Sequence, residues 1–398
     1  MPLLGWRAAA ALSATVDIHL VTQVRNRAAI EGASPAWPCT FIDTEDLAAP
    51  LYRLGSFLRG GNGKAWTLNS LLGSASYRLF EHRAWLALGS RVRAGAFDIV
   101  HRITPVSPGF ASPIAAKCVG VGVPFVLGPI NGGIPWPAGF EAERGREKEL
   151  LSMFRSLHRW MPGYESTRRN SAAIMVGSSA ALEDLPVGHR RKAMVVPENA
   201  VLEREVVCSP RDFSSLVLRV VFVGRLVPLK GVSMLIDAFK VVSDRCSGSL
   251  TLDIVGDGPE RLALERAAGG RSDIRFLGSV GRAAVMTMLR ESHILAFPSI
   301  REFGGGVVVE AMASGAVPVV VDYGGPHDLV PEGCGIRVAM TTRDGIVAEY
   351  ASVLGRALQD REWLAAMSGR GIDHVRSELT WEAKARGFVR LYEKLLAL

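Results

Sequence analysis

Residues 298–318 read PSIREFGGGVVVEAMASGAVP, and this stretch decides how the second half of the chain is expected to fold. It follows the apolar run that ends at Phe297, and its three glycines lead into an apolar segment that suits a buried helix. Glycines let a ligand approach the backbone closely, and the amides at a helix N-terminus attract anions. The stretch therefore predicts a strand, a glycine-rich turn and a helix whose start forms a phosphate site.

Two glutamates flank the predicted phosphate site, Glu302 before the glycines and Glu310 about one turn inside the helix. A phosphate would repel both carboxylates. They fit better as hydrogen-bond acceptors for the hydroxyl groups of a sugar and a ribose on either side of the phosphate. The alternative is a plain glycine-rich turn with two solvated glutamates.

The rest of the chain alternates between short apolar runs and segments that suit helices, a pattern typical of α/β domains with parallel sheets. In the first half, strands are predicted at 16–22, 97–101, 124–127 and 173–176. In the second half, strands are predicted at 218–223, 250–255, 274–277, 294–297 and 317–321, and helices at 232–242, 260–268, 282–290 and 307–313. The sequence therefore predicts two doubly wound, Rossmann-like α/β domains, 1–200 and 201–380, with a helix over 381–398 that packs back on the first.

A second group of candidate residues follows the predicted strand 218–223. Gly224 and Arg225 come directly after the strand, and Lys230 lies five residues beyond Arg225. Ligands in open α/β sheets bind outside the carboxyl ends of the strands, so both cations can reach the crevice that holds the glycine-rich turn. A guanidinium and an ammonium suit a diphosphate leaving group, whose negative charge grows as its bond to a sugar breaks.

Two further motifs, IVGDGP at 254–259 and FLGSV at 276–280, complete a pattern that resembles the Group 1 (family 4) retaining glycosyltransferases. The resemblance implies the GT-B fold, in which two Rossmann-like domains face each other across a cleft. It also implies that the C-terminal domain binds a nucleotide-sugar donor. Retention in this family is usually explained by front-face attack with the leaving phosphate as base, which requires no protein nucleophile.

The resemblance implies roles for individual residues. Arg225 and Lys230 would grip the donor diphosphate, Glu310 would bind the ribose hydroxyls, and Glu302 would contact the transferred sugar. Together with His101, these side chains form the predicted catalytic and donor-binding group. The resemblance further implies a set of backbone and loop contacts to the donor, from Gly224, Gly256, Asp257, Gly258, Val280, Gly305, Gly306 and Val307.

The N-terminal half resembles the family less closely. Residues 2–8 read as a helix, whereas family members usually have a strand and a Gly-Gly loop ahead of that helix. We therefore expect either that this strand and loop lie upstream of residue 1 or that the active site is damaged. Family members also often carry two histidines, one residue apart, where this chain has His101 and Ile103.

Two features at the strand ends of the first half are candidates for the reaction centre. His101 is either a structural residue, as histidines at strand ends more often are, or a catalytic or sugar-contacting one. Asn131, Gly132 and Gly133 follow the predicted strand 124–127 and should face the same crevice. They are either acceptor or donor contacts or a plain turn.

The residue types also bear on metals, cofactors and redox setting. No DxD pair of aspartates stands at a predicted strand end, so cationic side chains would replace a metal ion. We expect no metal and no cofactor, because the nucleotide-sugar is itself a substrate. The five cysteines lie far apart and indicate neither a zinc site nor a disulfide framework, which favours a reducing cytoplasm.

The charge distribution bears on partners. Residues 1–200 carry 22 Lys and Arg against 15 Asp and Glu, and residues 201–398 carry 24 of each, so the net charge of +7 lies in the first half. No nucleic-acid-binding motif accompanies it, so nucleic acid is not an expected partner. An anionic membrane surface and an ordinary solvated basic face both remain open. No apolar run is long enough to span a membrane, and we expect a cytoplasmic protein, either free or peripheral at the inner face of the membrane.

The sequence thus predicts a retaining glycosyltransferase that moves a sugar from a nucleotide-sugar to a sugar or lipid-linked acceptor. Such an enzyme would serve glycan, polysaccharide or glycoconjugate biosynthesis. One alternative is a catalytically weak or inactive nucleotide-sugar-binding protein. Another is a different GT-B activity, such as an epimerase or a phosphorylase, although a phosphorylase would need a pyridoxal-binding lysine on a much longer chain.

Overall fold

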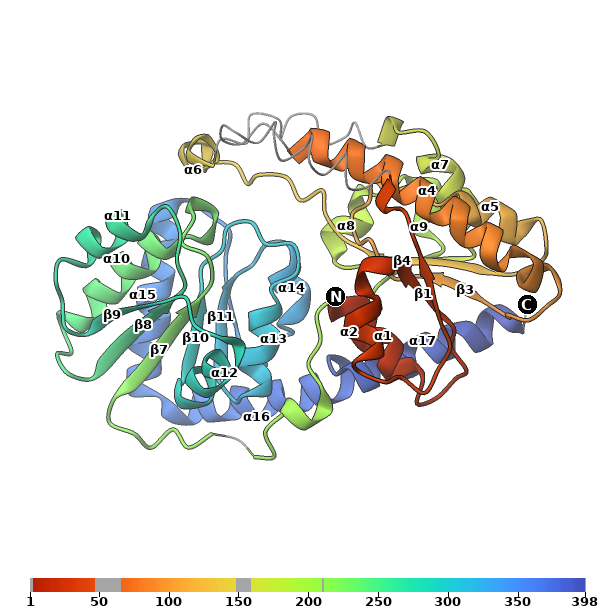
Figure 1. Cartoon of the computed structure of the whole chain (residues 1–398). Coiled ribbons are helices and arrows are strands. Elements are labelled where there is room, and N and C mark those ends of the chain that lie inside the picture. The colour runs from red at the N-terminus through yellow and green to blue at the C-terminus, as the bar shows by residue number, and fades with distance from the viewer. Residues whose placement is uncertain (1–2, 47–65, 148–158, 210, 398) are drawn as a thin grey trace. The chain divides into compact units, whose positions relative to one another are not determined.

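The computed structural model describes residues 3–46, 66–147, 159–209 and 211–397, and contacts divide the chain into two compact units (Figure 1). The first unit combines 1–133, 148–198 and 384–398, and the second combines 134–147 and 199–383. The division falls close to the predicted one, and the C-terminal helix extends into the first unit. The sequence, however, assigned 134–147 to the first domain, whereas the contacts of this segment assign it to the second.

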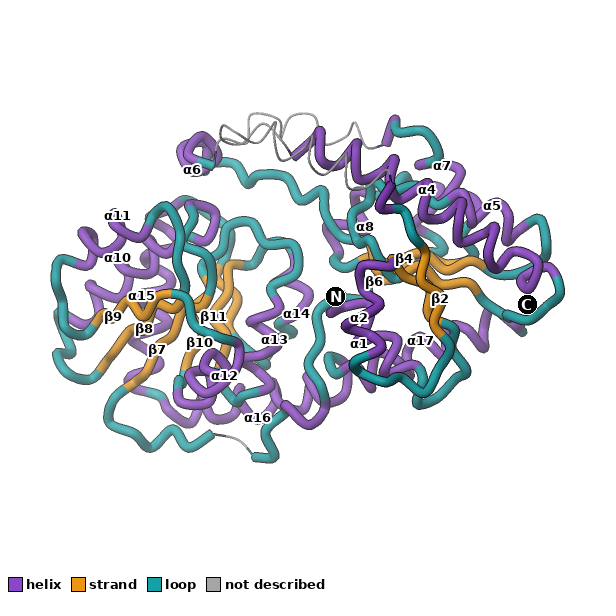
Figure 2. The backbone as a smooth tube through the Cα atoms, viewed as in Figure 1, coloured by secondary structure: helices purple, strands orange, loops and turns teal. Residues whose placement is uncertain are grey.

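The described residues of the first unit form two separate parallel sheets (Figure 2). The larger sheet has the strand order β3-β4-β5-β6, and the smaller one pairs β1 with β2. Their bounds are β1 (Leu20–Gln23), β2 (Cys39–Ile42), β3 (Val100–Arg102), β4 (Phe125–Ile130), β5 (Ala173–Val176) and β6 (Ala193–Val195). Every residue of β4 and β5 is buried, which explains why these strands read as continuous apolar runs.

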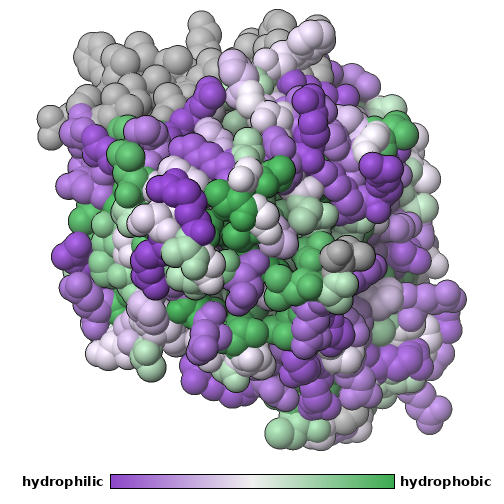
Figure 3. All heavy atoms as spheres, turned by 90° about the vertical axis from the view of Figure 1, so that its right-hand side faces the viewer, coloured by the Kyte–Doolittle hydropathy of each residue, from purple (hydrophilic) through white to green (hydrophobic). Residues whose placement is uncertain are grey.

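Helices from distant parts of the sequence cover these sheets. They are α1 (Leu3–Leu12), α2 (Arg27–Glu31), α4 (Trp66–Arg93), α5 (Pro113–Val119), α7 (Tyr164–Asn170), α8 (Ser179–Asp184), α9 (Val187–Arg190), α17 (Trp381–Leu396) and the 3₁₀ turn η1 (Val24–Asn26). Phe388 and Leu391 of α17 belong to the same buried cluster as Val126 and Met175 of the larger sheet. In the face shown in Figure 3, apolar side chains gather in the middle and hydrophilic ones surround them.

The second unit is built on one parallel sheet of six strands in the order β12-β11-β10-β7-β8-β9. The strands are β7 (Leu218–Val223), β8 (Leu250–Val255), β9 (Ile274–Gly278), β10 (Ile294–Phe297), β11 (Val317–Val321) and β12 (Ile336–Val338). The helices are α6 (Glu141–Arg146), α10 (Val232–Ser243), α11 (Arg261–Ala268), α12 (Arg282–Glu291), α13 (Gly306–Ala313), α14 (Gly325–Leu329), α15 (Arg343–Gln359) and α16 (Arg361–Glu378), with 3₁₀ turns η3 (Glu203–Glu205) and η4 (Pro228–Lys230). Contacts group α10 with α11 and α15, and α13 with α12 and α16.

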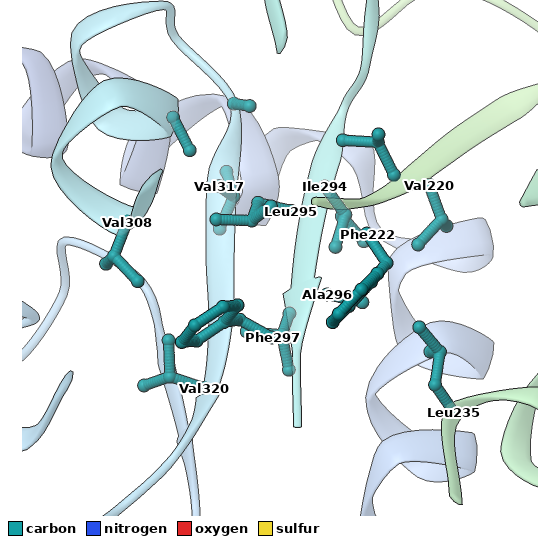
Figure 4. Packing of buried hydrophobic residues seen from close by; sticks show 14 of the residues in the cluster. Val220, Phe222, Leu235, Ile294, Leu295, Ala296, Phe297, Val308, Val317 and Val320 are labelled. Carbon is teal, nitrogen blue, oxygen red and sulfur yellow. The ribbon is translucent and has the colours of Figure 1, made fainter. Parts of the chain in front are cut away.

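The core of the second unit is a single cluster of buried apolar side chains around the central strands (Figure 4). Phe222 of β7 and Phe297 of β10 are both nearly inaccessible, and their rings stack with centroids 6.4 Å apart. Replacing such a residue by alanine typically costs about 3–5 kcal/mol. This core fixes the carboxyl ends of β7 and β10, which carry most of the candidate residues.

The predicted elements of the second unit agree closely with the observed ones. Four of its five predicted strands have the observed bounds, and 274–277 extends to 278. In the first half, the predicted strands 16–22 and 97–101 are observed as the shorter β1 and β3. Residues 2–8, which read as a helix, fall largely in α1.

No helix in the part of the chain that the structure describes is both long and apolar enough to cross a bilayer.

Candidate functional site

Three glycine-containing loops meet at the carboxyl ends of β7, β8 and β9. The amide of Gly256 donates to the carbonyl of Gly278 at 2.7 Å, and that of Leu226 donates to the carbonyl of Asp257 at 3.0 Å. A Cβ on Gly256 would lie 1.9 Å from the carbonyl oxygen of Gly224, and one on Gly258 would lie 2.4 Å from that of Leu226. These loops therefore contact each other backbone to backbone, which explains the glycines in IVGDGP.

The loop after β7 also contacts the loop after β10. Gly231 has φ +65°, and a Cβ there would lie 2.3 Å from the carbonyl oxygen of Pro298. This close approach brings Lys230 to Glu302, and the two form a mostly buried ion pair in which Lys230 Nζ donates to Glu302 Oε2. Lys230 Nζ also lies 4.9 Å from the ring centroid of Phe297. The structure thus joins two residues that the sequence placed in separate motifs.

Arg225, in contrast, is exposed and has no ion-pair partner among the residues that the structure describes. It follows Gly224 directly at the end of β7. Its charge is therefore available to an anion at this edge of the sheet, whereas the charge of Lys230 is balanced by Glu302. An anion that approached Lys230 would have to compete with that carboxylate.

The glycine-rich turn leads directly into α13. Gly305 has φ +72°, a conformation that side chains disfavour, and the helix begins at the next residue, Gly306. The turn is also bonded to the start of α14, because the backbone amide of Gly325 donates to the backbone carbonyl of Glu302 at 2.9 Å. Since Gly305 has no side chain to cap the helix, the first amides of α13, including that of Val307, are suited to an anionic ligand.

Glu310 lies in α13 and is held by Arg282 of α12, whose Nε donates to Glu310 Oε1 at 3.1 Å. The same guanidinium donates to both carboxylate oxygens of Glu205, at 2.6 and 3.3 Å. The bond to Glu205 raises the pKa of Arg282. Arg282 and Glu205 were not recognised from the sequence, because Glu205 lies outside every predicted strand and helix and Arg282 falls in a predicted helix that carries no motif.

The remaining donor-site candidates have local partners. Asp257 accepts a hydrogen bond from the amide of Gly258 at 2.7 Å, and its other oxygen lies 3.4 Å from Arg261. Val280 is partly buried and packs against the core of the second unit. These two residues therefore help to hold the shape of the loops after β8 and β9.

Residues 134–147 belong to this unit because they are bonded to the same loops. Arg301 is buried, and its Nε donates to the carbonyl of Ile134 at 3.0 Å. The hydroxyl of Tyr323 donates to the carbonyl of Pro135 at 3.1 Å. At the other end of the segment, Arg146 pairs with Glu260 at 2.7 Å. These contacts could not be predicted from the sequence, because the partners lie more than a hundred residues apart.

His101, in the first unit, is half-buried and uses both ring nitrogens within that unit. Nε2 lies 2.7 Å from the carbonyl oxygen of Gly128, and Nδ1 lies 2.6 Å from the hydroxyl of Tyr392. Because a carbonyl can only accept, Nε2 carries the proton and Nδ1 accepts from the tyrosine. Burial lowers the pKa of His101 to about 4, so the ring is neutral at pH 7.

Asn131, Gly132 and Gly133 also lie in the first unit. The side-chain nitrogen Nδ2 of Asn131 donates to Glu198 Oε1 at 2.9 Å, and the side-chain oxygen Oδ1 accepts from the hydroxyl of Ser178 at 3.2 Å. Gly132 and Gly133 both have positive φ. Next to this network, the buried Lys384 donates to the carbonyl of Pro197, and burial lowers its pKa to about 7. The side chain of Asn131 is thus engaged inside the unit.

Comparison with known families bears on the second unit. Residues 218–360 match the family described as "Glycosyl transferases group 1". This match covers the loops after β7, β8, β9 and β10 that form the candidate site. Over these residues, the second unit is similar to the group 1 glycosyl transferases.

Proteins of known sequence are also similar to this chain. An uncharacterized glycosyltransferase of Bacillus subtilis is 28% identical over 227 residues, which are 56% of this chain and 61% of that protein. A D-inositol 3-phosphate glycosyltransferase of Nocardia farcinica is 30% identical over 186 residues, covering 44% of this chain and 40% of that protein. A 2-deoxystreptamine glucosyltransferase of Streptomyces kanamyceticus is 26% identical over 364 residues, which are 83% of this chain and 87% of that protein. The matches thus span about half of the first two relatives.

Solved structures bear on the fold of the whole chain. A glycosyltransferase from Rickettsia africae has a TM-score of 0.59 at 12% identity, covering 99% of this chain and 94% of its own. Anabaena HepE in complex with UDP-glucose has a TM-score of 0.56 at 16% identity, and the match covers 98% of this chain and 95% of HepE. The fold is GT-B, as the sequence predicted.

Within the described residues, no three His, Cys, Asp or Glu side chains are grouped so that they could hold a metal ion.

Proposed function

We propose that the chain is a retaining glycosyltransferase that transfers a sugar from a nucleoside-diphosphate sugar to a sugar or lipid-linked acceptor. The observation that carries this proposal is the ion pair of Lys230 and Glu302 beside the start of α13. A cation, a carboxylate and helix amides in one place suit a ligand that has both phosphate and hydroxyl groups.

Donor binding would rearrange the charges of this site in a defined way. The diphosphate would take over Lys230 and meet the exposed Arg225, and Glu302 would turn from the lysine to a hydroxyl group of the sugar. Glu310, held by Arg282, would accept from the ribose hydroxyls. As the bond to the sugar breaks, the negative charge on the diphosphate grows, so both cations stabilise the transition state more than the ground state.

The acceptor hydroxyl would lose its proton to the departing phosphate, which gives retention without a protein nucleophile. We propose that the cations make a divalent metal dispensable. Transfer should then continue in excess EDTA, and a complete loss of transfer that Mn²⁺ or Mg²⁺ restores would contradict this part of the proposal. UDP-glucose is the first donor to test, since HepE was solved with it, followed by ADP- and GDP-sugars.

The decisive test replaces each cation by alanine. Arg225→Ala and Lys230→Ala should each lower kcat by roughly 10²–10³, the scale of losing one electrostatic donor to developing charge. Lys240→Ala is a matched control, because Lys240 belongs to the same unit but bonds to the carbonyl of Ala267 on α11. Near-normal turnover in both variants would rule out the proposed roles.

A weak or inactive nucleotide-sugar-binding protein is the second candidate. It is favoured by the first unit, where the ring nitrogens of His101 and the side chain of Asn131 are already engaged. On this view His101 positions the Gly128 carbonyl and α17 rather than contacting substrate. Calorimetric binding of UDP-glucose without any hydrolysis or transfer would support this candidate over the enzyme.

The positive charge of residues 1–200 supports a third part of the proposal, an acceptor at the anionic inner face of a membrane. The chain should then sediment with anionic vesicles at low salt and dissociate above about 0.15 M, where the Debye length is about 8 Å. Absence of sedimentation at low salt would favour a water-soluble acceptor and an ordinary basic surface. The free cysteines are consistent with a cytoplasmic setting.

A further inference from the structure

One segment of the second unit comes from the first half of the sequence, residues 134–147, which we call the strap. At its start, the backbone carbonyl of Ile134 accepts a hydrogen bond from Arg301 Nε at 3.0 Å. At its end, Glu147 Oε1 accepts from the backbone amide of Leu229 at 3.3 Å. Arg301 follows β10 and Leu229 follows β7, so the strap joins the loops at the carboxyl ends of these two strands.

Both attachment points lie next to the ion pair of the candidate site. Arg301 directly precedes Glu302, and Leu229 directly precedes Lys230. The two loops are also bonded to each other, because the amide of Ile300 donates to the carbonyl of Leu229 at 3.0 Å. The strap and this bond together close a ring of contacts through the two loops. Supporting hydrogen bonds of this kind hold functional side chains in place.

The middle of the strap is anchored in the hydrophobic core. Phe140 is 1% exposed and belongs to the same buried cluster as Phe222 and Phe297. Arg146, in contrast, is about half exposed where it pairs with Glu260, and an ion pair in such a position contributes little. The strap is therefore held mainly by the core that also fixes the ends of β7 and β10.

Arg301 makes the attachment next to Glu302. It is buried, and its guanidinium carbon lies 5.1 Å from the ring centroid of Trp136 in the strap and 5.2 Å from that of Phe303 in the glycine-rich turn. A planar guanidinium can contact aromatic rings and donate hydrogen bonds at the same time. Arg301 therefore joins the strap to the turn through its charge, its flat face and its hydrogen bond.

The strap also packs beside the peptide of Glu302. A Cβ on Gly324 would lie 2.4 Å from the carbonyl oxygen of Glu302 and 2.9 Å from Cδ1 of Ile134. The backbone at Gly324 is thus in close contact with both residues. Because protein interiors are closely packed, a shift of Ile134 would be felt at the backbone that carries Glu302.

We propose that the strap positions the ion pair of Lys230 and Glu302, and that Arg301 is the positioning residue that directs Glu302 toward the sugar of the donor. The part that concerns the sugar rests on the proposed function, whereas the part that concerns the ion pair does not. Arg301 acts through the backbone of the residue beside it. Without its contacts Glu302 would turn more freely, while Arg225 would still meet the diphosphate.

The first test measures how fast the amine of Lys230 reacts with a trace of acetic anhydride in the ligand-free protein, followed by mass spectrometry. The ion pair shields this amine while the strap is attached. Arg301→Met should raise the acetylation rate about tenfold, because local opening of the pair becomes more frequent. Tyr323→Phe is the matched control, since it removes a bond of 3.1 Å to the strap at Pro135 but leaves Arg301 in place. It should leave the rate almost unchanged.

The other end of the strap gives a second pair of variants. Glu147→Ala should also raise the acetylation of Lys230, whereas Glu147→Gln keeps an acceptor for the amide of Leu229 and should not. The amine of Lys240 is the internal reference, and a parallel rise there would show that a variant has lost its fold. Glu147→Ala alters a less buried position than Arg301→Met and decides the question if the latter does not fold. Acetylation of Lys230 at the wild-type rate in the folded variants would overturn the proposal.

The second test concerns the sugar and uses calorimetry with UDP and UDP-glucose. Arg301→Met should weaken the binding of UDP-glucose about tenfold and that of UDP much less, because UDP has no sugar for Glu302 to contact. An equal loss for both ligands, or no loss for either, would overturn the role of Arg301 toward the sugar. Failure of the wild-type chain to bind UDP-, ADP- or GDP-glucose would instead count against the proposed function. The acetylation rates would then still decide whether the strap positions the ion pair.

Discussion

The two units differ in how continuous their sheets and their buried clusters are. Among the described residues, the second unit has one sheet of six strands and one large buried cluster, whereas the first has two sheets, two smaller clusters and a cavity of about 700 Å³. The second unit also keeps its candidate residues on loops that touch backbone to backbone. In the first unit, the candidate residues His101 and Asn131 are joined to elements that come much later in the sequence.

This difference bears on how each unit holds its candidate residues in place. The loops of the second unit are held by a continuous sheet, so the second unit can keep the geometry of an anion site without a ligand. The first unit depends on α17, which comes from the last part of the sequence and contributes Phe388 and Leu391 to the buried cluster that contains Val126 and Met175. The following predictions test whether the two units respond differently to substitution, pH and loss of ion pairs.

The largest effect is expected from Gly231→Ala in the second unit. Its new Cβ would lie 2.3 Å from the carbonyl oxygen of Pro298, so the loops after β7 and β10 would have to separate. We expect the second unit to lose more than about 3 kcal/mol of stability in urea denaturation, together with UDP-glucose binding. Gly269→Ala is the matched control, with φ +67° and open space around it, and should cost only about 1–2 kcal/mol. If both substitutions cost the same free energy of unfolding, backbone strain at positive φ, and not the contact with Pro298, would account for the loss of stability.

The sequence predicted most of the second unit because its information is local. Buried parallel strands read as apolar runs, and the glycines at 256 and 305 are required by positive φ or by a close backbone neighbour. The ion pair of Lys230 and Glu302 and the clamp of Arg282 could not be predicted, since they depend on which loops become neighbours. For the same reason, the sequence assigned 134–147 to the wrong unit, because the bond between Arg301 and Ile134 spans 167 residues.

The next effect concerns pH. Burial lowers the pKa of His101 to about 4, below the ordinary value of 6.5, so the unfolded chain takes up a proton at a higher pH than the folded one. The contribution of the neutral ring to the free energy of unfolding is complete above pH 6.5 and is lost as the pH falls from 6.5 to 4. A shift of this size corresponds to about 3 kcal/mol. His101→Gln should therefore flatten the pH dependence of the first unit in this range, measured by urea denaturation at successive pH values.

His293 in the second unit provides a comparison for His101. Its pKa is also lowered to about 4, first by burial and then by Arg211, Arg361 and Arg219. Three arginine charges contribute to this shift, whereas Arg102 alone lowers the pKa of His101 by its charge, so added salt should weaken the acid sensitivity caused by His293 more than that caused by His101. Equal salt effects for His101→Gln and His293→Gln would contradict this difference between the units.

A smaller effect is expected from Arg282→Met. Glu310 would lose the guanidinium that holds it and would face Glu205 without a cation between them. We expect UDP-glucose to bind about tenfold more weakly, equivalent to about 1.4 kcal/mol, with little change in unfolding. Arg343→Met is the matched control, because its pair with Asp237 has a similar exposure and lies on α10 and α15. If both variants weakened binding equally, the effect would be one of overall charge.

The smallest effect is expected at the pair of Arg275 and Asp253, which joins neighbouring residues of β9 and β8 at 2.6 Å. The arginine side chain is 60% exposed, so water and salt screen the attraction, and holding the long side chain costs entropy. A double-mutant cycle of Arg275→Gln and Asp253→Asn should give a coupling energy of at most about 1 kcal/mol that decreases with salt. The stability of the second unit would then come from its continuous core, which this pair does not touch. A coupling several times larger would mean that this edge of the sheet depends on surface charge, and the contrast between the two units would be weaker than the buried clusters indicate.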